Sequence, residues 1–421
     1  MITKQGNKII TDLLIISIRT NDFPEFHVIP NKYFNMKGII ILFLILTTSI
    51  NAQTWTSVSS VPTTGRDDGI CFALNGFGYA VTGNLNGFAE SNKLFQYDPN
   101  TDSWSEKAVF PGTARQYSTA FTLNGKAYII GGYSESGQAL KDVWQYDGFT
   151  NTWTQLNDFP GVARWHATAL SIREQGYLGM GTTADSTLAD FWKYNADLDS
   201  WLRLSDYPGG PNRSVLGFPL LNEGIFGEGF DINPITYSAA WYAFNPGTGT
   251  WTGIAPLPAG LRAYGTAVSN EYNAIICGGM DENNVFSNDC YFLDHTKTWR
   301  AANPLPVGGL RGSKGFSLNG QFYLGTGLND NFNRVSDFYK LALPVTSIQE
   351  TLLFPNPSKD YFNLISEPNT EVKVYSLAGQ LLQSLRTNEA GFLEIKQLPI
   401  GLYVCLIGGE NSKEIKKIAK L

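Results

Sequence analysis

The stretch LNGKAYIIGG, from Leu123 to Gly132, decides the fold of this chain because close copies of it occur elsewhere in the sequence. LNGFGYAVTG at 74–83 and LNGQFYLGTG at 318–327 match it. In each copy Asn-Gly stands between apolar, β-prone residues. This is a strong hairpin signal, since both central residues of a type I′ turn take positive φ. Each copy therefore predicts two strands joined by a tight turn.

Two ladders of single residues give the period of this repeat. Tryptophans recur at steps of 48 to 50 residues, at Trp55, Trp104, Trp153, Trp201, Trp251 and Trp299. Arginines recur at steps of 49, at Arg66, Arg115, Arg164, Arg213, Arg262 and Arg311. After the hairpin comes an aromatic third strand, such as 143–147, and then a polar turn leads to the strand that holds the Trp. Four short strands in each of six repeats predict an all-β chain that folds as a six-bladed β-propeller.

The way the ring closes can also be predicted. The last repeat has its third strand near Asp337–Leu341, and no Trp follows it, whereas Trp55 stands before the first full repeat. We therefore expect the N-terminal strand around Trp55 to be the fourth strand of the last blade. This arrangement pairs two strand edges that would otherwise be exposed.

The two ends of the chain are predicted to be separate from the propeller, which we place at residues 53–343. Residues 36–52 combine a Lys, an apolar run too short to span a bilayer and a small final residue, as a secretory signal peptide does. Residues 1–35 are then an upstream segment before a true start at Met36, or else part of a long n-region. From 344 to 421 the ladders stop, and short alternating strands predict a small immunoglobulin-like β-sandwich.

The repeat resembles the kelch repeat. The matching features are the diglycines Gly131-Gly132 and Gly278-Gly279, the Tyr downstream and the Trp some 20 residues later. Four repeats depart from the diglycine, where the sequence reads TG at 82–83, GMG at 179–181, GEG at 227–229 and GTG at 325–327. The resemblance covers residues 53–343 and implies a kelch propeller.

The C-terminal region, 344–421, resembles the type A sorting domain of the type IX secretion system of Bacteroidota. The matching parts are FPNP at 354–357, GQ at 379–380, GLY at 401–403 and the Lys-rich end. The resemblance implies that type IX machinery handles this region as a partner. The protein would then be secreted, or attached to the outer surface of the cell. The alternative is an immunoglobulin-like module without a sorting role.

Composition excludes several classes of function. Charged residues make up 16% of the chain and the net charge is −6, with no basic cluster interleaved with aromatics in the propeller, so nucleic acid is not an expected partner. No Cys/His cluster has metal-ligand spacing, and we expect neither metal nor cofactor. Cys277 and Cys290 fall on predicted neighbouring strands, where an oxidising compartment permits a disulfide; two isolated buried thiols are the alternative.

The six ladder arginines are predicted to form a ring near one mouth of the central channel, because the first strand of each blade lines the axis. Unpaired, they would repel one another. Acids follow the Arg only in the first repeat, as Asp67 and Asp68. One interpretation is that each Arg bonds backbone carbonyls and fixes the geometry between blades. The other is that the ring holds an anionic ligand, such as a sialic or uronic acid.

The residues that follow each Arg differ from blade to blade, as the residues of a ligand site do. Two positions on, they are Asp68, Tyr117, His166, Val215, Tyr264 and Ser313. Among the residues directly after each Arg, Trp165 is the aromatic one. Tyr117, Trp165, His166 and Tyr264 are therefore candidate ligand-binding residues, since aromatics beside carboxylate and imidazole suit a sugar or peptide pocket. The alternative is that they are ordinary first-strand residues.

Catalysis has little support from the sequence. His166 is the candidate general base near the axis, with Asp68 as its candidate partner. Kelch-type copper oxidases need a second suitable His, whereas sialic acid mutarotases of six-bladed kelch type need only acid–base groups and an Arg. We favour a binding or adhesion module for a glycan or protein ligand. The alternatives are a carbohydrate-active enzyme of the sialic acid mutarotase type and a purely structural surface protein.

Overall fold

The computed structural model describes residues 54–270 and 272–342, and in the C-terminal region 353–354, 361–364, 370–376, 380–387, 392–394, 398–399, 401–407 and 414–420. The predicted upstream segment 1–35 and signal peptide 36–52 lie outside the described residues. Every regular element in the described part is a strand. No helix there is long and apolar enough to cross a membrane.

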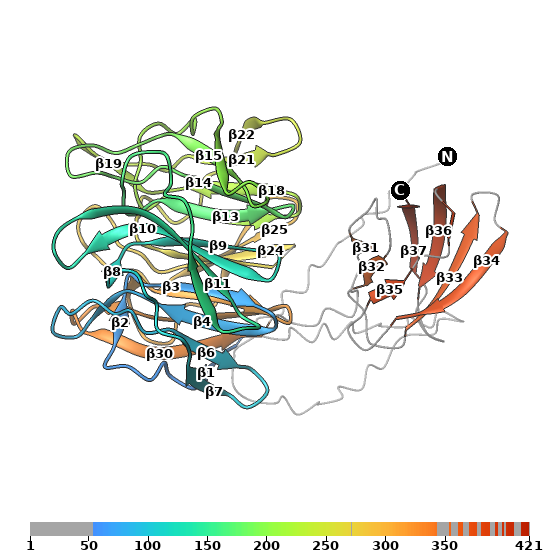
Figure 1. Ribbon diagram of the computed structural model, residues 1–421, viewed down its shortest axis with the longest axis horizontal. Coiled ribbons are helices and arrows are strands. Elements are labelled where there is room, and N and C mark those ends of the chain that lie inside the picture. The colour runs from blue at the N-terminus through green and yellow to red at the C-terminus, as the bar shows by residue number, and fades with distance from the viewer. Residues whose placement is uncertain are drawn as a thin grey trace, which may run out of the picture. The chain divides into compact units, whose positions relative to one another are not determined.

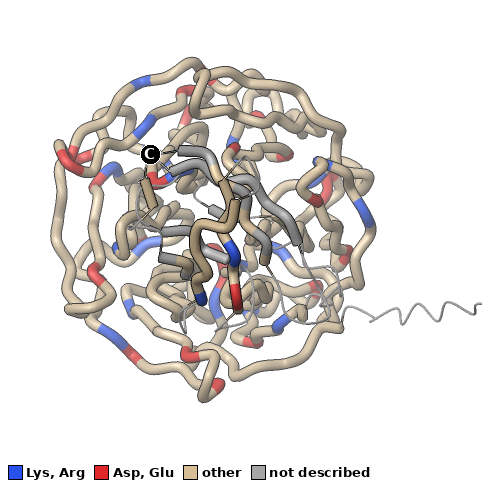
Figure 2. The backbone as a smooth tube through the Cα atoms, turned by 90° about the vertical axis from the view of Figure 1, so that its right-hand side faces the viewer, with Lys and Arg blue, Asp and Glu red and all other residues tan. Residues whose placement is uncertain are grey.

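Residues 54–342 form six antiparallel sheets, which are the six predicted blades. Blade 1 consists of β3 (Ile70–Leu74), β4 (Phe77–Val81), β6 (Phe95–Asp98) and β7 (Ser103–Glu106). Blade 2 consists of β9 (Thr119–Leu123), β10 (Lys126–Ser134), β11 (Ala139–Asp147) and β12 (Thr152–Gln155). Blades 3 and 4 consist of β13 (Thr168–Ile172), β14 (Gln175–Gly179), β15 (Phe191–Asn195), β16 (Ser200–Arg203) and of β17 (Leu216–Leu220), β18 (Glu223–Gly227), β21 (Trp241–Asn245), β22 (Thr250–Ile254). Blades 5 and 6 consist of β23 (Thr266–Ser269), β24 (Asn273–Cys277), β25 (Cys290–Asp294), β26 (Trp299–Ala302) and of β28 (Lys314–Leu318), β29 (Gln321–Asn329), β30 (Arg334–Leu341), β1 (Trp55–Val58). Figure 2 shows the chain closing into a ring.

Short strands extend some blades at the ends where the ladder arginines stand. They are β2 (Arg66–Asp67) with β5 (Asn84–Leu85), β8 (Arg115–Gln116), β19 (Phe230–Ile232) with β20 (Ile235–Tyr237), and β27 (Leu310–Arg311). The loops that join the second and third strands of each blade lie at this same end, because consecutive strands are antiparallel. We call this end of the propeller the loop face.

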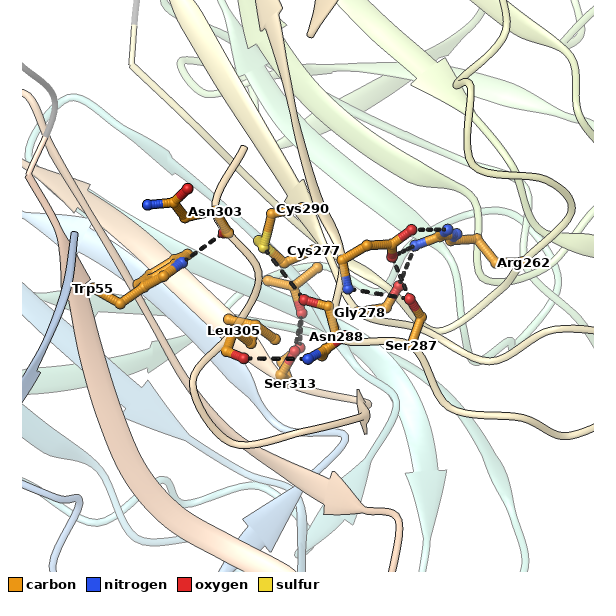
Figure 3. The surroundings of a disulfide bond; sticks show 12 residues. Trp55, Arg262, Cys277, Gly278, Ser287, Asn288, Cys290, Asn303, Leu305 and Ser313 are labelled. Atoms are coloured by element: carbon orange, nitrogen blue, oxygen red, sulfur yellow. Dashed lines mark hydrogen bonds and ion pairs between the residues drawn. A yellow bond between two sulfur atoms is a disulfide. The ribbon is translucent and has the colours of Figure 1, made fainter. Parts of the chain in front are cut away.

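The predicted closure of the ring is confirmed. Strand β1 pairs with β30 in antiparallel register, from Trp55 opposite Leu341 to Val58 opposite Phe338 (Figure 1). The indole of Trp55 donates to the carbonyl of Asn303, which precedes blade 6 (Figure 3). In blade 2 the indole of Trp153 makes the equivalent bond, to the carbonyl of Ala108. Trp55 therefore has the same role in the last blade as the other ladder tryptophans.

Apolar side chains of adjacent blades interleave to form the core. The first strands alternate between buried and half-buried residues, as the pattern of β3 shows, and the second strands are buried almost throughout. One cluster joins Phe72 and Tyr79 of blade 1 to Ile129 and Tyr146 of blade 2. Each such buried side chain contributes about 1.5–3 kcal/mol, so contact between neighbours stabilises every blade.

The backbone explains why the diglycine is only half conserved among the six repeats. Its second position is always Gly, with φ between 88° and 112°, as in Gly132 and Gly279. A Cβ on Gly132 would lie 2.9 Å from the carbonyl oxygen of Gln116, so a side chain has no room. The first position has φ between 55° and 68°, a left-handed conformation that other residues adopt at moderate cost. Thr82, Met180, Glu228 and Thr326 therefore occupy the first position without breaking the blade.

Cys277 and Cys290 form a disulfide between β24 and β25, where they face each other in the strand register (Figure 3). Of the two alternatives that the sequence left open, the structure has the disulfide. Both residues are buried in the cluster between blades 5 and 6. The bond cross-links the strands within blade 5, beside the segment that holds Asp289.

The C-terminal region forms a three-stranded and a four-stranded sheet. Their orders are β31 (Leu353–Phe354), β32 (Tyr361–Leu364), β35 (Phe392–Glu394), and β34 (Leu381–Arg386), β33 (Glu371–Ser376), β36 (Gly401–Ile407), β37 (Glu414–Lys420). Leu393 of the smaller sheet shares a buried cluster with Val374 and Cys405 of the larger one. The all-β class is confirmed, and the immunoglobulin-like sandwich stays a prediction.

Candidate functional site

Three ladder arginines are held inside their own blades. Each donates two hydrogen bonds of 2.5–2.9 Å to an Asp just before the third strand or on it, and a further one to a backbone carbonyl. The pairs are Arg115–Asp142, Arg164–Asp190 and Arg262–Asp289. The sequence shows acids directly after the Arg only in the first repeat, so these three partners were not predicted. They stand 26 or 27 residues downstream of each Arg.

The other three arginines lack this pairing. The position of the Asp is taken by Lys93 in blade 1 and by Ala240 in blade 4. Arg66 is buried over the ring of Phe95, and its Nε and Nη1 have no hydrogen-bond partner among the described residues. Burial lowers the pKa of Arg66 to about 10. In blade 6 the equivalent acid, Asp337, bonds Ser60 and leaves Arg311 to other partners.

Arg213 of blade 4 and Arg311 of blade 6 both approach the ring of Tyr264 in blade 5, which lies between them. The guanidinium carbon of Arg213 lies 5.9 Å from the centre of the Tyr264 ring, and that of Arg311 lies 5.3 Å from it. Arg213 also donates to the hydroxyl of Tyr264 (3.3 Å). Asp68 is the acid nearest to Arg311, at 3.6 Å. Two cations therefore converge on Tyr264, and the carboxyl group of Asp68 lies near one of them, Arg311.

A ring of backbone hydrogen bonds forms the mouth itself. Five N–H···O=C bonds of 2.9–3.2 Å join equivalent positions of adjacent blades. All six positions have φ between 52° and 63°, and they are Asp68, Tyr117, His166, Ser214, Tyr264 and Gly312. The spacing of two residues after each Arg predicts Val215 and Ser313 in this ring. That prediction is wrong, because blades 4 and 6 reach the left-handed position one residue after the Arg instead of two. Gly312 is needed beside Asp68, since a Cβ would lie 2.6 Å from the Asp68 carboxylate.

Asp68, Tyr117 and His166 form a titratable cluster within the ring. Burial, with the neighbouring Asp67 charge, raises the pKa of Asp68 to about 7, although Arg311 opposes this. The charge of Asp68 and burial together raise the pKa of Tyr117 well above its ordinary value. Burial and then Arg213 hold the pKa of His166 well below its ordinary value, so its imidazole is neutral at pH 7. The ring of His166 lies 3.8 Å from that of Tyr117 and 5.3 Å from that of Tyr264.

The structure thus brings together half of the predicted ligand-binding residues and separates the other half. Arg213, Arg311, Tyr117, His166 and Tyr264 meet with Asp68 at the mouth. Trp165 instead packs on Tyr133, with ring centres 4.7 Å apart. The other four arginines lie inside their blades and hold the blade structure together. They are Arg66, Arg115, Arg164 and Arg262.

Behind the mouth the channel holds a cavity of about 180 Å³, lined by first strands or the residues just before them in all six blades. Lys314 is the charged residue of the lining, and it contributes to keeping His166 neutral. Cys71 lies there as well, and burial raises the pKa of its thiol to about 12, which leaves it unreactive at neutral pH. Among the described residues no group of His, Cys, Asp or Glu is arranged to hold a metal ion.

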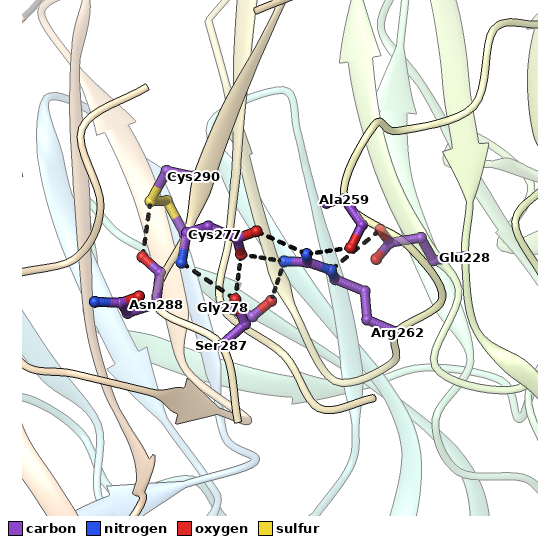
Figure 4. A network of polar contacts seen from close by, with 9 residues as sticks. Glu228, Ala259, Arg262, Cys277, Gly278, Ser287, Asn288 and Cys290 are labelled. Carbon is purple, nitrogen blue, oxygen red and sulfur yellow. Dashed lines mark hydrogen bonds and ion pairs between the residues drawn. A yellow bond between two sulfur atoms is a disulfide. The ribbon is translucent and has the colours of Figure 1, made fainter. Parts of the chain in front are cut away.

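Glu228 is a buried carboxyl group that the sequence analysis did not single out. Neither of its oxygens has a hydrogen-bond partner among the described residues, and Arg262 Nε lies 3.9 Å from Oε1 (Figure 4). The short hydrogen bonds of Arg262 go to Asp289, which leaves only a weak attraction between Arg262 and Glu228. Burial therefore outweighs this attraction and raises the pKa of Glu228 to about 8. In the sequence, the sign of this group was the replacement of the diglycine by GEG at 227–229.

Replacing Glu228 by Gln should flatten the dependence of stability on pH. Between pH 4.5 and about 8 the folded protein retains a proton that the unfolded chain has released. The free energy of unfolding therefore falls as pH rises through this window, by up to about 1.4 kcal/mol per pH unit. Urea denaturation of the wild type and of Glu228→Gln at several pH values measures the difference. Exposed Glu282→Gln is the control, and parallel profiles for Glu228→Gln and the wild type would contradict the expectation.

Comparisons with known proteins agree with this architecture. A family model described as the KLHDC2/KLHL20/DRC7 Kelch-repeats domain matches residues 41–229. A second model, described as a secretion system C-terminal sorting domain, matches residues 352–420. No curated protein matches the chain. A solved structure titled "Structure of YjhT" is similar with a TM-score of 0.57 and 16% identity, over 69% of this chain and 98% of that one. At this identity the likeness concerns the fold alone.

Proposed function

Because this chain is a kelch-repeat six-bladed propeller with a C-terminal secretion-system sorting domain, we propose that it is a secreted or cell-surface binding module. Its ligand carries a carboxylate that sits between Arg213 and Arg311. The sorting domain points to secretion, and a rigid ring with variable loop-face residues suits recognition.

The arginine pair is the observation that carries the proposal. Arg115, Arg164 and Arg262 have their own carboxylates. Among the described residues Arg213 has none, and Arg311 has only Asp68 at 3.6 Å, whose pKa is near 7. With Lys314 close by, the mouth has excess positive charge in a half-buried position, which attracts an anion. A carboxylate fits two guanidinium groups through charge-assisted hydrogen bonds. Tyr117 and Tyr264 add aromatic surface, which suits an acidic sugar.

Isothermal titration with N-acetylneuraminic acid and glucuronic acid, each beside its methyl ester, tests this. One acid should bind at least tenfold more tightly than its ester, because charged hydrogen bonds contribute about 1.5–3 kcal/mol each. Arg213→Gln and Arg311→Gln should each weaken the acid about ten- to a hundredfold. Arg300→Gln, at an exposed outer position, is the matched control. Acid and ester that bind equally, or no binding of either acid, would refute the proposal.

The titratable cluster supports a second candidate, a carbohydrate-active enzyme of the sialic acid mutarotase type. Asp68, with a pKa near 7, and neutral His166 stand beside the arginine pair. In mutarotation a base removes the proton of the anomeric hydroxyl while an acid protonates the ring oxygen, so that the ring C–O bond breaks. The open form then recloses on its other face, and both protons return.

Proton NMR of anomer exchange in sialic acid separates the two candidates. An enzyme should accelerate exchange above the uncatalysed rate, and His166→Ala and Asp68→Asn should abolish the acceleration while sugar binding persists. A binding module should leave the rate unchanged at protein concentrations that saturate the sugar.

A further inference from the structure

A line of cation–π and edge-to-face aromatic contacts runs from the mouth to the exposed surface of the loop face. Arg311 lies over Tyr264 at 5.3 Å and over Phe286 at 5.8 Å. The ring of Phe286 is 5.6 Å from that of Phe332, and the side chain of Phe332 is 71% exposed. We call Tyr264, Phe286 and Phe332 the aromatic track. It connects the arginine pair to solvent without interruption.

Exposed apolar side chains occur on the loop face on one side of the ring. Four consecutive blades, from 4 through 6 to 1, each carry one in the loop between the second and third strands. They are Ile235, Val285, Phe332 and Phe88, all more than 60% exposed. The equivalent loops of blades 2 and 3 carry small and polar residues, ESGQ at 135–138 and TADS at 183–186. The apolar side therefore coincides with the blades that supply Arg213, Tyr264 and Arg311, and such a patch marks a contact surface.

The charge of these loops limits the kind of ligand. They carry acidic residues all around the mouth, and these are Glu90, Glu135, Asp185, Asp231, Asp281, Glu282 and Asp330. A polyanion would be repelled by this rim, whereas a ligand with one terminal carboxylate would place its charge only at the arginine pair. The part of the ligand that crosses the rim should therefore be uncharged.

The same loops offer side chains that suit uncharged sugars. Exposed amides adjoin these apolar tips, with Asn283 and Asn284 just before Val285, and Asn331 and Asn333 on either side of Phe332. An amide supplies both donors and an acceptor, which match sugar hydroxyls. An aromatic face supplies rigid apolar area for the C–H side of a sugar ring.

From these observations we infer that the ligand is an oligosaccharide, neutral except for one acidic sugar at its end. The acidic sugar occupies the mouth, and the following neutral sugars lie along the aromatic track on Phe286 and Phe332. The inference rests on the proposed function and adds the direction and length of the ligand to it.

The test compares three probes on the full mature chain by isothermal titration: N-acetylneuraminic acid, the trisaccharide in which this acid caps lactose, and lactose alone. We expect the trisaccharide to bind at least tenfold more tightly than the monosaccharide. Phe332→Ala should remove this gain and leave the affinity for the monosaccharide unchanged. Phe149→Ala is the matched control, since Phe149 is 81% exposed in the turn between the third and fourth strands of blade 2, away from the loop face.

The possible results distinguish a failure of this inference from a failure of the proposed function. If the monosaccharide binds through Arg213 and Arg311 but the trisaccharide gains nothing, the inference is wrong and the proposed function stands. If Phe332→Ala weakens both acidic probes equally, the track has no separate role and the inference is again wrong. If none of the probes binds, or if the loop face binds only a protein, both are wrong.

Discussion

Replacing Asp190 by Ala should lower the free energy of unfolding by about 3–5 kcal/mol. Arg164 is 2% exposed, and two of its nitrogens donate to Asp190 at 2.5 and 2.7 Å. Without the carboxylate, the guanidinium would stay buried among backbone groups with its charge uncompensated. The indole of Trp192, which also donates to Asp190, would lose its partner too. The cost is therefore that of an unpaired buried charge, which far exceeds the contribution of a surface ion pair.

Chemical denaturation of Asp190→Ala beside Glu106→Ala measures this expectation. Glu106 pairs with Lys93, and both side chains are about half exposed, so its loss should cost about 1 kcal/mol or less. Asp142→Ala in the neighbouring blade should behave as Asp190→Ala does, because Arg115 has the same contacts. Equal stability of Asp190→Ala and Glu106→Ala would show that the arginine ladder does not support the blades.

Removing Arg334 should cost a similar amount, about 3–5 kcal/mol, because it leaves a buried acid without its partner. Its guanidinium bonds Asp67 at 2.6 Å, and Asp67, in the short strand β2 of blade 1, is 1% exposed. Arg334 also lies over Phe88, and its carbonyl accepts from Asn86. These contacts join blade 6 to blade 1, so Arg334→Ala leaves a buried charge where the ring closes.

A double-mutant cycle checks this explanation. Asp67→Asn together with Arg334→Ala removes the buried charge, so the double variant should be more stable than Arg334→Ala alone. Arg300→Ala, at an exposed position, should change stability by about 0.5 kcal/mol or less. A double variant that is less stable than Arg334→Ala would contradict the role of Asp67 as an uncompensated charge.

The sequence predicted the blades because the features that define them are periodic. Each ladder Trp and each ladder Arg keeps its register through loops of variable length, and the position of Trp55 was enough to predict ring closure. Cys277 and Cys290 were placed on neighbouring strands correctly. The choice between thiols and a disulfide depended on which residues oppose each other, and the period does not give that register.

The candidate site was only partly predictable for two physical reasons. The acids that neutralise Arg115, Arg164 and Arg262 stand near the third strand, beyond a loop, so that adjacency in sequence gave no sign of them. The backbone also turns one residue earlier at Ser214 and Gly312 than in other blades, although the spacing of the arginines is constant. The distinction between arginines held by an acid of their own blade and the pair that we propose binds the ligand therefore appears only in three dimensions.

The ring of left-handed residues at the mouth has a consequence for how such proteins diversify. Its hydrogen bonds run from N–H to C=O, so they are indifferent to which side chain each position carries. The constraint on substitution is the backbone conformation, which costs a residue other than Gly about 1–3 kcal/mol and least for Asn or Asp. Residues such as His166 or Tyr117 can therefore be exchanged without disturbing the blades. Divergent copies of this scaffold can acquire new specificities by single substitutions at five of these positions, since Gly312 has no room for a side chain beside Asp68.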